Sequence, residues 1–433
     1  MSAQQPRPPL KAHVAHWLIR HQNSIHRLRA RGFGLDALRG RPPTLELYYE
    51  PGDPHSHLAA QLLPALGERL RCPVVIRVVG APEEALYPEA DKQRQCALDD
   101  AGMVAPAYGL SFPAQAVLPD APSRQRAAAT LLQAAEAGRF AEVEPGIAQA
   151  LFRGEAIAVP DPSPDADAVA QRLAENGRRR ARLGHYLPGM WQFNGVWYWG
   201  VDRMAHLEAA LREAGLLQGE SPLLRCQPEA ARLPEGLSAQ APLEFFYSFR
   251  SPYSYLAAVD VQRAQADWPG PMHVRPVLPM VMRGLKVPAR KRMYIVRDTY
   301  REAQRRGLPF GLVADPVGAG AERCLTSFTL AGGTTQQLAL LVSASRAIWS
   351  QGVDVATDAG LRAVSEASGM DWATVRAKLD DGMDLTQAEA NRQALFAAGL
   401  WGVPSFRYGP LVTWGQDRWW LVEEARRRVA AGV

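Results

Sequence analysis

The chain has 433 residues, of which 47% are hydrophobic and 21% charged, with a formal net charge of +5. This length suggests two or three domains rather than one compact core. No segment approaches the roughly 20 apolar residues of a membrane span, and the first forty residues lack the apolar run of a secretion signal. The four cysteines form no CxxC pair and the nine histidines no HExxH motif, so we expect no metal. We therefore expect a cytoplasmic protein, with neither nucleic acid nor membrane as a partner.

Residues 1–43 are predicted to be a basic N-terminal extension. Residues 1–41 contain eight Lys or Arg and a single acidic residue, Asp36. Such a segment is either a solvated extension with one amphipathic helix or a surface that contacts an acidic partner.

A sequence repeat follows the extension. Residues 45–60 match residues 243–258 at an offset of 198, with eight identities in sixteen positions, and the same offset relates Phe112 to Phe310. Near the end of each half, the segment from His185 resembles the segment from Trp401. We pair Pro188 with Pro404 at an offset of 216, so that the second copy has about 18 extra residues.

Both copies predict the same elements in the same order. Each begins with an apolar strand, at 45–49 and 243–249, and a helix that starts at Asp53-Pro54 or Ser251-Pro252. A second strand, a long Ala-, Arg- and Leu-rich helical stretch, a hairpin and a C-terminal amphipathic helix complete each copy. We predict an α/β fold of two tandem thioredoxin-like domains, each with an inserted α-helical cap. The copies occupy residues 44–215 and 242–433, and the Pro-, Gly- and Ser-rich residues 216–241 form a linker.

The start of the helix in each copy has two interpretations. Ser or Asp before Pro is a strong helix-capping signal, because the side-chain oxygen accepts a free N–H and proline has no N–H to leave unpaired. In a thioredoxin-type fold, however, this helix N-terminus also stabilises an anion such as a thiolate. Neither copy has a cysteine there, which excludes dithiol exchange at this point. Ser251 can instead donate a hydrogen bond to the thiolate of a bound cofactor.

The second copy resembles a known family. The segments FFYSFRSPYSYLA, VPARKRMYIVRDTYREAQRRGLPF, GVPSF and WGQDR are similar to the 2-hydroxychromene-2-carboxylate isomerase and kappa-class glutathione transferase family of the DsbA-like thioredoxin superfamily. The resemblance covers most of residues 242–433 and is fainter in the first copy. It implies that glutathione is the cofactor and that the Ser251 hydroxyl activates its sulfur.

The same resemblance implies the rest of the glutathione site. Val403 would pair its backbone with the cysteinyl part of glutathione, and Pro404 would be in the cis form, as would Pro188 in the first copy. Asp417 would face the γ-glutamyl ammonium, with Arg418 as a less certain neighbour. The implied cofactor-binding residues are Val403, Pro404, Trp414, Gly415, Gln416 and Asp417.

Several of these residues have a simpler explanation. Ser251 could act only as a helix cap, and Asp417 could cap the final helix. The basic residues between Arg283 and Arg297 read most simply as a solvated helix face. Alternatively, Lys286 and Arg290 at i, i+4 hold a carboxylate of the substrate or of glutathione. Tyr294 and Asp298 have the same spacing, and pairing across this face with a neighbouring helix is their simplest explanation.

The first copy departs from the pattern. It has Asp53 where the second has Ser251, and a carboxylate beside a thiolate would raise the thiol pKa. We expect a degenerate copy that keeps the turn at Asp202 and mimics the second subunit of a homodimer within a monomeric chain.

The resulting hypothesis is a glutathione-dependent isomerase or transferase that acts on a small aromatic or unsaturated anionic substrate. The alternative is a non-catalytic DsbA-like binding or scaffold protein. A periplasmic disulfide oxidoreductase ranks third, because the chain lacks CxxC and a signal sequence.

Overall fold

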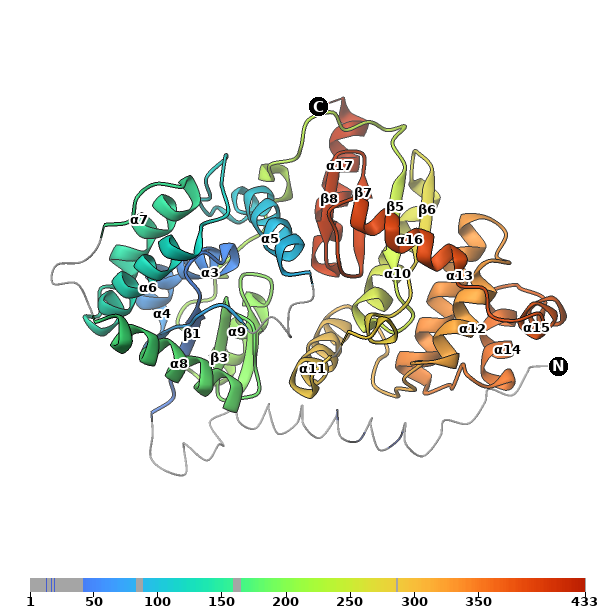
Figure 1. Ribbon diagram of the computed structural model, residues 1–433, viewed down its shortest axis with the longest axis horizontal. Coiled ribbons are helices and arrows are strands. Elements are labelled where there is room, and N and C mark those ends of the chain that lie inside the picture. The colour runs from blue at the N-terminus through green and yellow to red at the C-terminus, as the bar shows by residue number, and fades with distance from the viewer. Residues whose placement is uncertain are drawn as a thin grey trace. The chain divides into compact units, whose positions relative to one another are not determined.

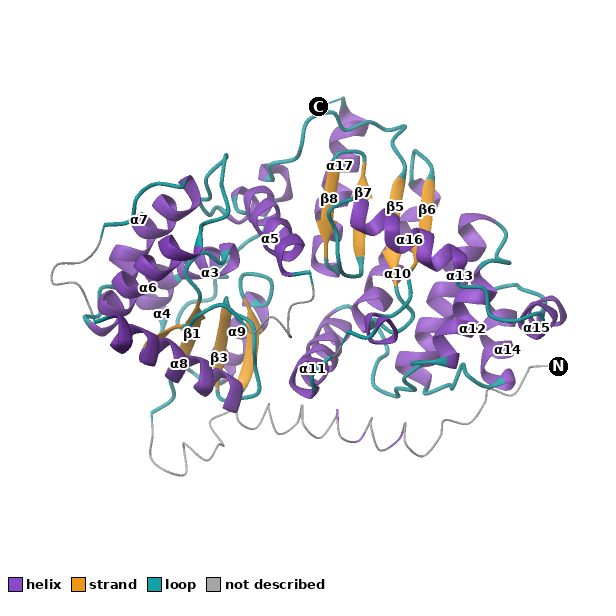
Figure 2. Ribbon diagram, viewed as in Figure 1, coloured by secondary structure: helices purple, strands orange, loops and turns teal. Residues whose placement is uncertain are grey.

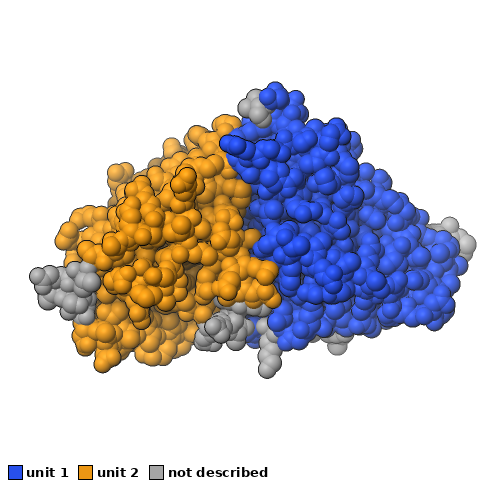
Figure 3. All heavy atoms as spheres, turned by 45° about the horizontal axis from the view of Figure 1, so that its top comes forward, with its two compact units in different colours: residues 1–22, 233–433 blue, residues 23–232 orange. Residues whose placement is uncertain are grey.

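The computed structural model describes residues 42–82, 89–158, 165–285 and 287–432, together with residues 13, 17 and 19. Figure 3 shows two compact units, which we call the N-terminal unit (residues 23–232) and the C-terminal unit (residues 233–433, grouped with residues 1–22). The boundary falls inside the expected linker. The first part of that linker belongs to the N-terminal unit, because Leu217 bridges Leu70 and the Gln218 N–H donates to the Arg69 carbonyl.

The N-terminal unit contains a four-stranded mixed sheet in the order β2-β1-β3-β4. β1 (Leu45–Tyr49) pairs parallel to β2 (Val74–Val78) and antiparallel to β3 (Met190–Phe193), which pairs with β4 (Val196–Trp199). All five residues of β1 are buried, which explains why the four residues other than Glu46 are all leucine or tyrosine. Asn194 and Gly195 form the hairpin turn with positive φ angles of 47° and 79°, as an Asn-Gly pair predicts.

Helices fill the rest of the N-terminal unit (Figure 1). Those between β2 and β3 form the predicted helical insertion, and the last helix follows β4. The α-helices are α3 (Pro54–Ala60), α4 (Leu63–Arg69), α5 (Ala90–Val104), α6 (Ala121–Glu136), α7 (Phe140–Arg153), α8 (Ala166–Arg182) and α9 (Met204–Glu213).

The C-terminal unit contains a second sheet of the same order and strand directions, β6-β5-β7-β8. Its strands are β5 (Leu243–Tyr247), β6 (Met272–Pro276), β7 (Ser405–Tyr408) and β8 (Leu411–Trp414). β5 pairs parallel to β6 and antiparallel to β7, and β7 pairs antiparallel to β8.

The registers of the two sheets correct the alignment of the hairpins. Leu45 lies opposite Val74 and Leu243 opposite Met272, which keeps the offset of 198 in both strands. On the other side, Leu45 faces Phe193 and Leu243 faces Tyr408. Phe193 and Tyr408 give an offset of 215, so the expected offset of 216 is wrong by one, and the extra length of the C-terminal insertion is one residue less than expected.

That longer insertion consists of several helices that gather beside the C-terminal sheet (Figure 2). The expected basic helix is shorter than the 287–310 segment, since it ends at Arg305, before Leu308 and Pro309 enter the following loop. The α-helices are α10 (Pro252–Ala264), α11 (Ala289–Arg305), α12 (Ala319–Phe328), α13 (Gly333–Arg346), α14 (Asp358–Ala367), α15 (Trp372–Asp380), α16 (Thr386–Ala397) and α17 (Trp419–Ala431).

A buried carboxylate is anchored in the same way in each sheet. Glu46 of β1 pairs with Arg77 of β2 at 3.0 Å, and Glu244 of β5 pairs with Arg275 of β6 at 2.5 Å. Burial alone would raise the pKa of Glu46, but hydrogen bonds from Arg179 and Tyr48 outweigh it and lower that pKa. The two sheets therefore share strand order, register and polar anchors.

The cores beneath the first strands differ between the units. In the N-terminal unit, Glu144 of α7 accepts a hydrogen bond from the Tyr49 hydroxyl at 2.8 Å and contacts His57 Nδ1 at 2.8 Å. All three residues are almost completely buried. In the C-terminal unit, Tyr247 instead pairs with the Ser345 hydroxyl at 2.6 Å. A network of ionisable groups in one unit thus replaces a neutral hydroxyl pair in the other.

Candidate functional site

Ser251 occupies the N-cap of α10, directly after β5. Its Oγ accepts a hydrogen bond from the Ser254 N–H at 3.2 Å, and the hydroxyl donates to the Val403 carbonyl oxygen at 3.4 Å. Pro252 fills the first helical position, where its missing N–H leaves no group unpaired. The capping role of Ser251 is therefore present, and the same hydroxyl reaches the loop that precedes β7.

That loop contains a cis peptide bond between Val403 and Pro404, the one cis bond in the described parts of the chain. The Pro404 carbonyl accepts from the Gly415 N–H at 2.9 Å, which ties the loop to the turn after β8. No hydrogen bond joins the Val403 N–H to another described residue, and Val403 is only partly buried. Its backbone donor therefore remains available beside the Ser251 hydroxyl.

The turn after β8 holds the other expected cofactor residues. The Trp414 ring packs against Trp401, with centroids 5.1 Å apart, and lies close over Gly402, where an added Cβ would be 2.8 Å from the Trp414 Nε1 atom. Gly415 takes a φ of 100°, which a side chain would disfavour. Gln416 is buried and donates to Asp417 Oδ1 at 2.5 Å.

Asp417 does not cap the final helix. The N-cap of α17 is Arg418, and it makes no side-chain capping bond. The capping explanation for Asp417 is therefore wrong, and its partly buried carboxylate is held by the neighbouring Gln416 amide instead. Arg418 is 3% exposed and donates to the Asp417 carbonyl.

The expected anion-binding pair is only partly described. Lys286 lies outside the described residues. Arg290 is in the first turn of α11 and is half-buried.

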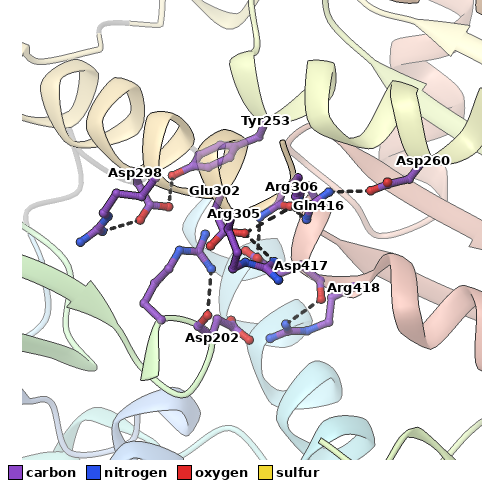
Figure 4. Close-up of polar contacts among 12 residues, drawn as sticks. Asp202, Tyr253, Asp260, Asp298, Glu302, Arg305, Arg306, Gln416, Asp417 and Arg418 are labelled. Atoms are coloured by element: carbon purple, nitrogen blue, oxygen red, sulfur yellow. Dashed lines mark hydrogen bonds and ion pairs between the residues drawn. The ribbon is translucent and has the colours of Figure 1, made fainter. Parts of the chain in front are cut away.

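Asp298 of α11 pairs with a residue of the neighbouring helix α10, next to Ser251. The Tyr253 hydroxyl donates to Asp298 Oδ2 at 2.8 Å, and Arg301 donates to Oδ1 of the same buried carboxylate at 2.6 Å (Figure 4). Pairing of this face with a neighbouring helix is therefore confirmed for Asp298, whose partner Tyr253 the sequence did not identify. The equivalent residues at the offset of 198, His55 and Asp100, also pair, at 3.3 Å.

In the N-terminal unit, Asp53 caps α3 in the position of Ser251. Its Oδ2 accepts from the Ser56 N–H at 2.8 Å and from the Ser56 hydroxyl at 2.6 Å. At the offset of 215, Pro404 corresponds to Gly189, whose carbonyl accepts from the Gly200 N–H just as Pro404 does from Gly415. The Leu187–Pro188 bond is not cis, so the expectation of a cis bond at Pro188 is wrong. Gly189 occupies the place that is equivalent to Pro404.

Gly189 also lies directly against the acidic cap. A Cβ at Gly189 would be 3.2 Å from both Asp53 Oδ2 and the Ser56 nitrogen, and its φ is 64°. The N-terminal unit thus combines a carboxylate and a glycine where the C-terminal unit has a hydroxyl and a cis-proline.

A second carboxylate, Glu50, lies three residues before Asp53. Burial and repulsion from Asp53 raise the pKa of Glu50 to about 8, against the opposing effect of Arg180 and Arg124. Burial also raises the pKa of Asp53, although His55 and Ser56 oppose it. With raised pKa values, these carboxyl groups tend to hold a proton, whereas a site that stabilises a thiolate favours the deprotonated, anionic form.

The Glu50 carboxyl should make the N-terminal unit less stable as the pH rises. Its folded-state pKa is above its unfolded value, so the folded chain binds this proton more tightly and stability falls between pH 4.5 and 8. We expect Glu50→Gln to raise the free energy of unfolding at pH 9 by about 1–2 kcal/mol and to change it little at pH 4. Chemical denaturation at both pH values measures this.

Glu142→Gln is the matched control, because Glu142 is 71% exposed and pairs only on the surface with Arg139. Its effect should stay below about 0.5 kcal/mol at either pH. An equal effect of Glu50→Gln at pH 4 and pH 9 would show that Glu50 does not titrate in this way.

Two of the four cysteines are poor sources of a thiolate at neutral pH. Burial raises the pKa of the Cys324 thiol to about 12, and burial with nearby aspartates raises that of Cys96 to about 12.

Within the described ranges, no group of three or more His, Cys, Asp or Glu side chains could hold a metal ion. Among the helices whose residues are described, none combines the length and hydropathy needed to cross a membrane.

Comparisons with known proteins concern the C-terminal unit. A family model described as a DSBA-like thioredoxin domain matches residues 242–426. The 2-hydroxychromene-2-carboxylate isomerase of Pseudomonas putida is 25% identical over 198 residues, which cover 43% of this chain and 95% of that protein.

Solved structures match the same share of the chain. A structure of 2-hydroxychromene-2-carboxylate isomerase is 24% identical with a TM-score of 0.39, and the match covers 44% of this chain and 97% of that one. The cytosolic disulfide reductase DsbM from Pseudomonas aeruginosa with GSH is 15% identical with a TM-score of 0.29, covering 44% and 98%. Residues 242–426 thus contain a DsbA-like thioredoxin domain that is distantly homologous to 2-hydroxychromene-2-carboxylate isomerase.

Proposed function

We propose that the C-terminal unit binds glutathione and catalyses a glutathione-dependent isomerisation or transfer on a small aromatic or unsaturated anionic molecule. The observation that carries this proposal is the contact between Ser251 Oγ and the Val403 carbonyl at 3.4 Å. It brings a helix N-terminus, a hydroxyl donor and the backbone of a cis-proline loop to one point. The distant homology to 2-hydroxychromene-2-carboxylate isomerase supports the reaction class.

The residues at this point fit the chemical groups of glutathione. The Val403 N–H has no partner among the described residues, so it can pair with the cysteinyl carbonyl in the manner of an added strand. The partly buried Asp417 carboxylate offers an opposite charge to the γ-glutamyl ammonium. DsbM, a distant relative in fold, has been solved with GSH.

Ser251 would stabilise the thiolate by donating its hydroxyl proton. The hydrogen bond to the Val403 carbonyl is long, at 3.4 Å, so redirecting the hydroxyl to a sulfur anion costs little. The N–H groups at the start of the 13-residue helix α10 add a favourable field of roughly a kcal/mol. When bound, glutathione would supply a nucleophilic thiol that adds reversibly to a conjugated carbon of the substrate.

Two further features concern the substrate. Arg290 would bind its anionic group from the first turn of α11, and Lys286 remains a predicted partner in that role. The cytoplasmic location and a monomeric state remain predictions.

A non-catalytic binding protein is the second candidate. Ser251 already accepts one hydrogen bond and donates another within the protein, as a purely structural cap would. Asp53 shows that this position can be a cap with a side chain unsuited to thiolate activation.

Titration calorimetry with glutathione separates these candidates. We expect the parent chain to bind one equivalent and Ser251→Ala to bind about tenfold more weakly or worse, because a charge-assisted hydrogen bond is lost. Thr357→Ala is the matched control. Thr357 caps α14 by accepting from the Gly360 N–H at 3.1 Å and donating to the Asp354 carbonyl at 2.7 Å.

The control should lose a similar cap, about 1 kcal/mol of stability, with unchanged glutathione affinity. A parent chain that does not bind glutathione would overturn the proposed function. Equal affinity for the parent and Ser251→Ala would leave Ser251 as a cap only.

A further inference from the structure

A partly buried polar triad links α10, α11 and the turn after β8. It consists of Asp260, Arg306 and Gln416 (Figure 4). Arg306, the C-cap of α11, donates from Nη1 to Asp260 Oδ2 at 2.5 Å and from Nη2 to Gln416 Oε1. The Gln416 amide nitrogen in turn donates to Asp417 Oδ1. The triad therefore ends on the carboxylate assigned above to the glutathione ammonium.

Arg306 determines how the Gln416 amide is turned. An arginine can only donate hydrogen bonds, so it selects the amide oxygen and leaves the amide nitrogen facing Asp417. Gln416 is 2% exposed, which leaves this side chain little freedom to rotate. The Gln416 amide thus links the Asp417 carboxylate to the end of α11.

The N-terminal unit has other residues at the positions of the triad. At the offset of 198, Asp260 and Arg306 correspond to Leu62 and Tyr108, and at the offset of 215 Gln416 corresponds to Val201. The backbone is alike only in part. The glycines that follow Tyr108 and Arg306 both have a φ of 66°. Leu62, however, lies between α3 and α4, whereas Asp260 is inside α10.

The triad is also costly to bury. The side chains of Arg306 and Asp260 are only 16% and 19% exposed, and burial raises the pKa of Asp260 even beside Arg306. Well-packed apolar residues often replace such a pair with no loss of stability. A gain in stability is therefore a weak explanation for the triad.

We propose that Arg306 is a positioning residue that sets the affinity of the C-terminal unit for the γ-glutamyl end of glutathione. It acts through Gln416 on Asp417 and does not touch the ligand. This inference rests on the proposed glutathione site and adds a determinant of which thiol that site accepts. A thiol without the γ-glutamyl group should not depend on the triad.

The test copies the N-terminal unit into the C-terminal unit within the full chain. The triple variant Asp260→Leu, Arg306→Tyr, Gln416→Val is titrated with glutathione and with cysteinylglycine, which lacks the γ-glutamyl group. We expect glutathione affinity to fall about tenfold or more, as for loss of a well-oriented charge contact, with cysteinylglycine affinity unchanged. The thermal midpoint should be unchanged or raised.

Two further variants complete the design. Gln416→Leu alone removes the link to Asp417 while the Arg306 and Asp260 pair remains, and it should show the same selectivity if the triple variant does not fold. Arg362→Met, which removes a 58% exposed arginine of α14, should leave both affinities unchanged.

The outcomes separate this inference from the proposed function. A parent chain that binds neither thiol overturns both. A parent that binds glutathione, with folded variants that bind it equally well, overturns the positioning role alone. Equal losses for glutathione and cysteinylglycine would show a general structural effect and also overturn it.

Discussion

Ser251→Asp is expected to give a folded protein that no longer ionises bound glutathione. Aspartate keeps the cap, as Asp53 does for α3 by accepting from the Ser56 N–H at 2.8 Å. Its carboxylate would repel the thiolate and raise the thiol pKa. The ultraviolet absorbance of the thiolate in the glutathione complex near neutral pH should therefore disappear, and turnover should fall by two orders of magnitude or more.

Ser251→Ala and Ser251→Cys are the companion variants. Alanine removes both cap and donor, so about 1 kcal/mol of stability should be lost together with the thiolate signal. Cysteine should form a mixed disulfide with glutathione if the tripeptide docks against Val403. A folded Ser251→Asp variant that ionises bound glutathione as the parent does would leave the helix cap as the whole role of Ser251.

Glu144→Ala is expected to destabilise the N-terminal unit by about 3 kcal/mol, because it removes a buried acceptor and creates a cavity between α3 and α7. Glu144 is 1% exposed and holds both the Tyr49 hydroxyl and His57 Nδ1 at 2.8 Å. Alanine would leave these buried groups without that acceptor. Denaturant unfolding, followed by hydrogen exchange in the strand β1, measures the loss.

Ser345→Ala is the matched variant in the C-terminal unit. The Tyr247 hydroxyl it would release lies 3.4 Å from the Leu341 carbonyl, which can accept its proton. We therefore expect a loss of about 1 kcal/mol. A loss for Glu144→Ala as small as that for Ser345→Ala would show that the ionisable network carries no extra stability.

The strands were predictable because their signals are local. The apolar runs at β1 and β5 and the Asn-Gly turn specify strands and a hairpin by themselves. Matching Pro188 to Pro404 failed, because a shared residue type in a loop does not fix register. Trp199 and Trp414, each paired at the edge of its hairpin, define the offset of 215 instead.

The site could be predicted only where one segment carries the signal. The Ser251-Pro252 turn and the Val403-Pro404 loop each stand out in the sequence, and the structure places them in contact. Gln416 was expected in the site, but its partners Asp260 and Arg306 were missed, because they come from two other segments and each resembles an ordinary surface residue. Helical spacing predicted that the face with Asp298 pairs with a neighbouring helix, but it could not identify Tyr253 as the partner, because i, i+4 neighbours carry no information about residues on another helix.

A structure of the full chain with glutathione tests the central claim most directly. The account predicts one glutathione in the C-terminal unit, with its sulfur within hydrogen-bonding distance of Ser251 Oγ, its cysteinyl backbone paired with Val403 and its ammonium against Asp417. Glutathione bound elsewhere, or bound with its sulfur directed away from Ser251, would contradict the account.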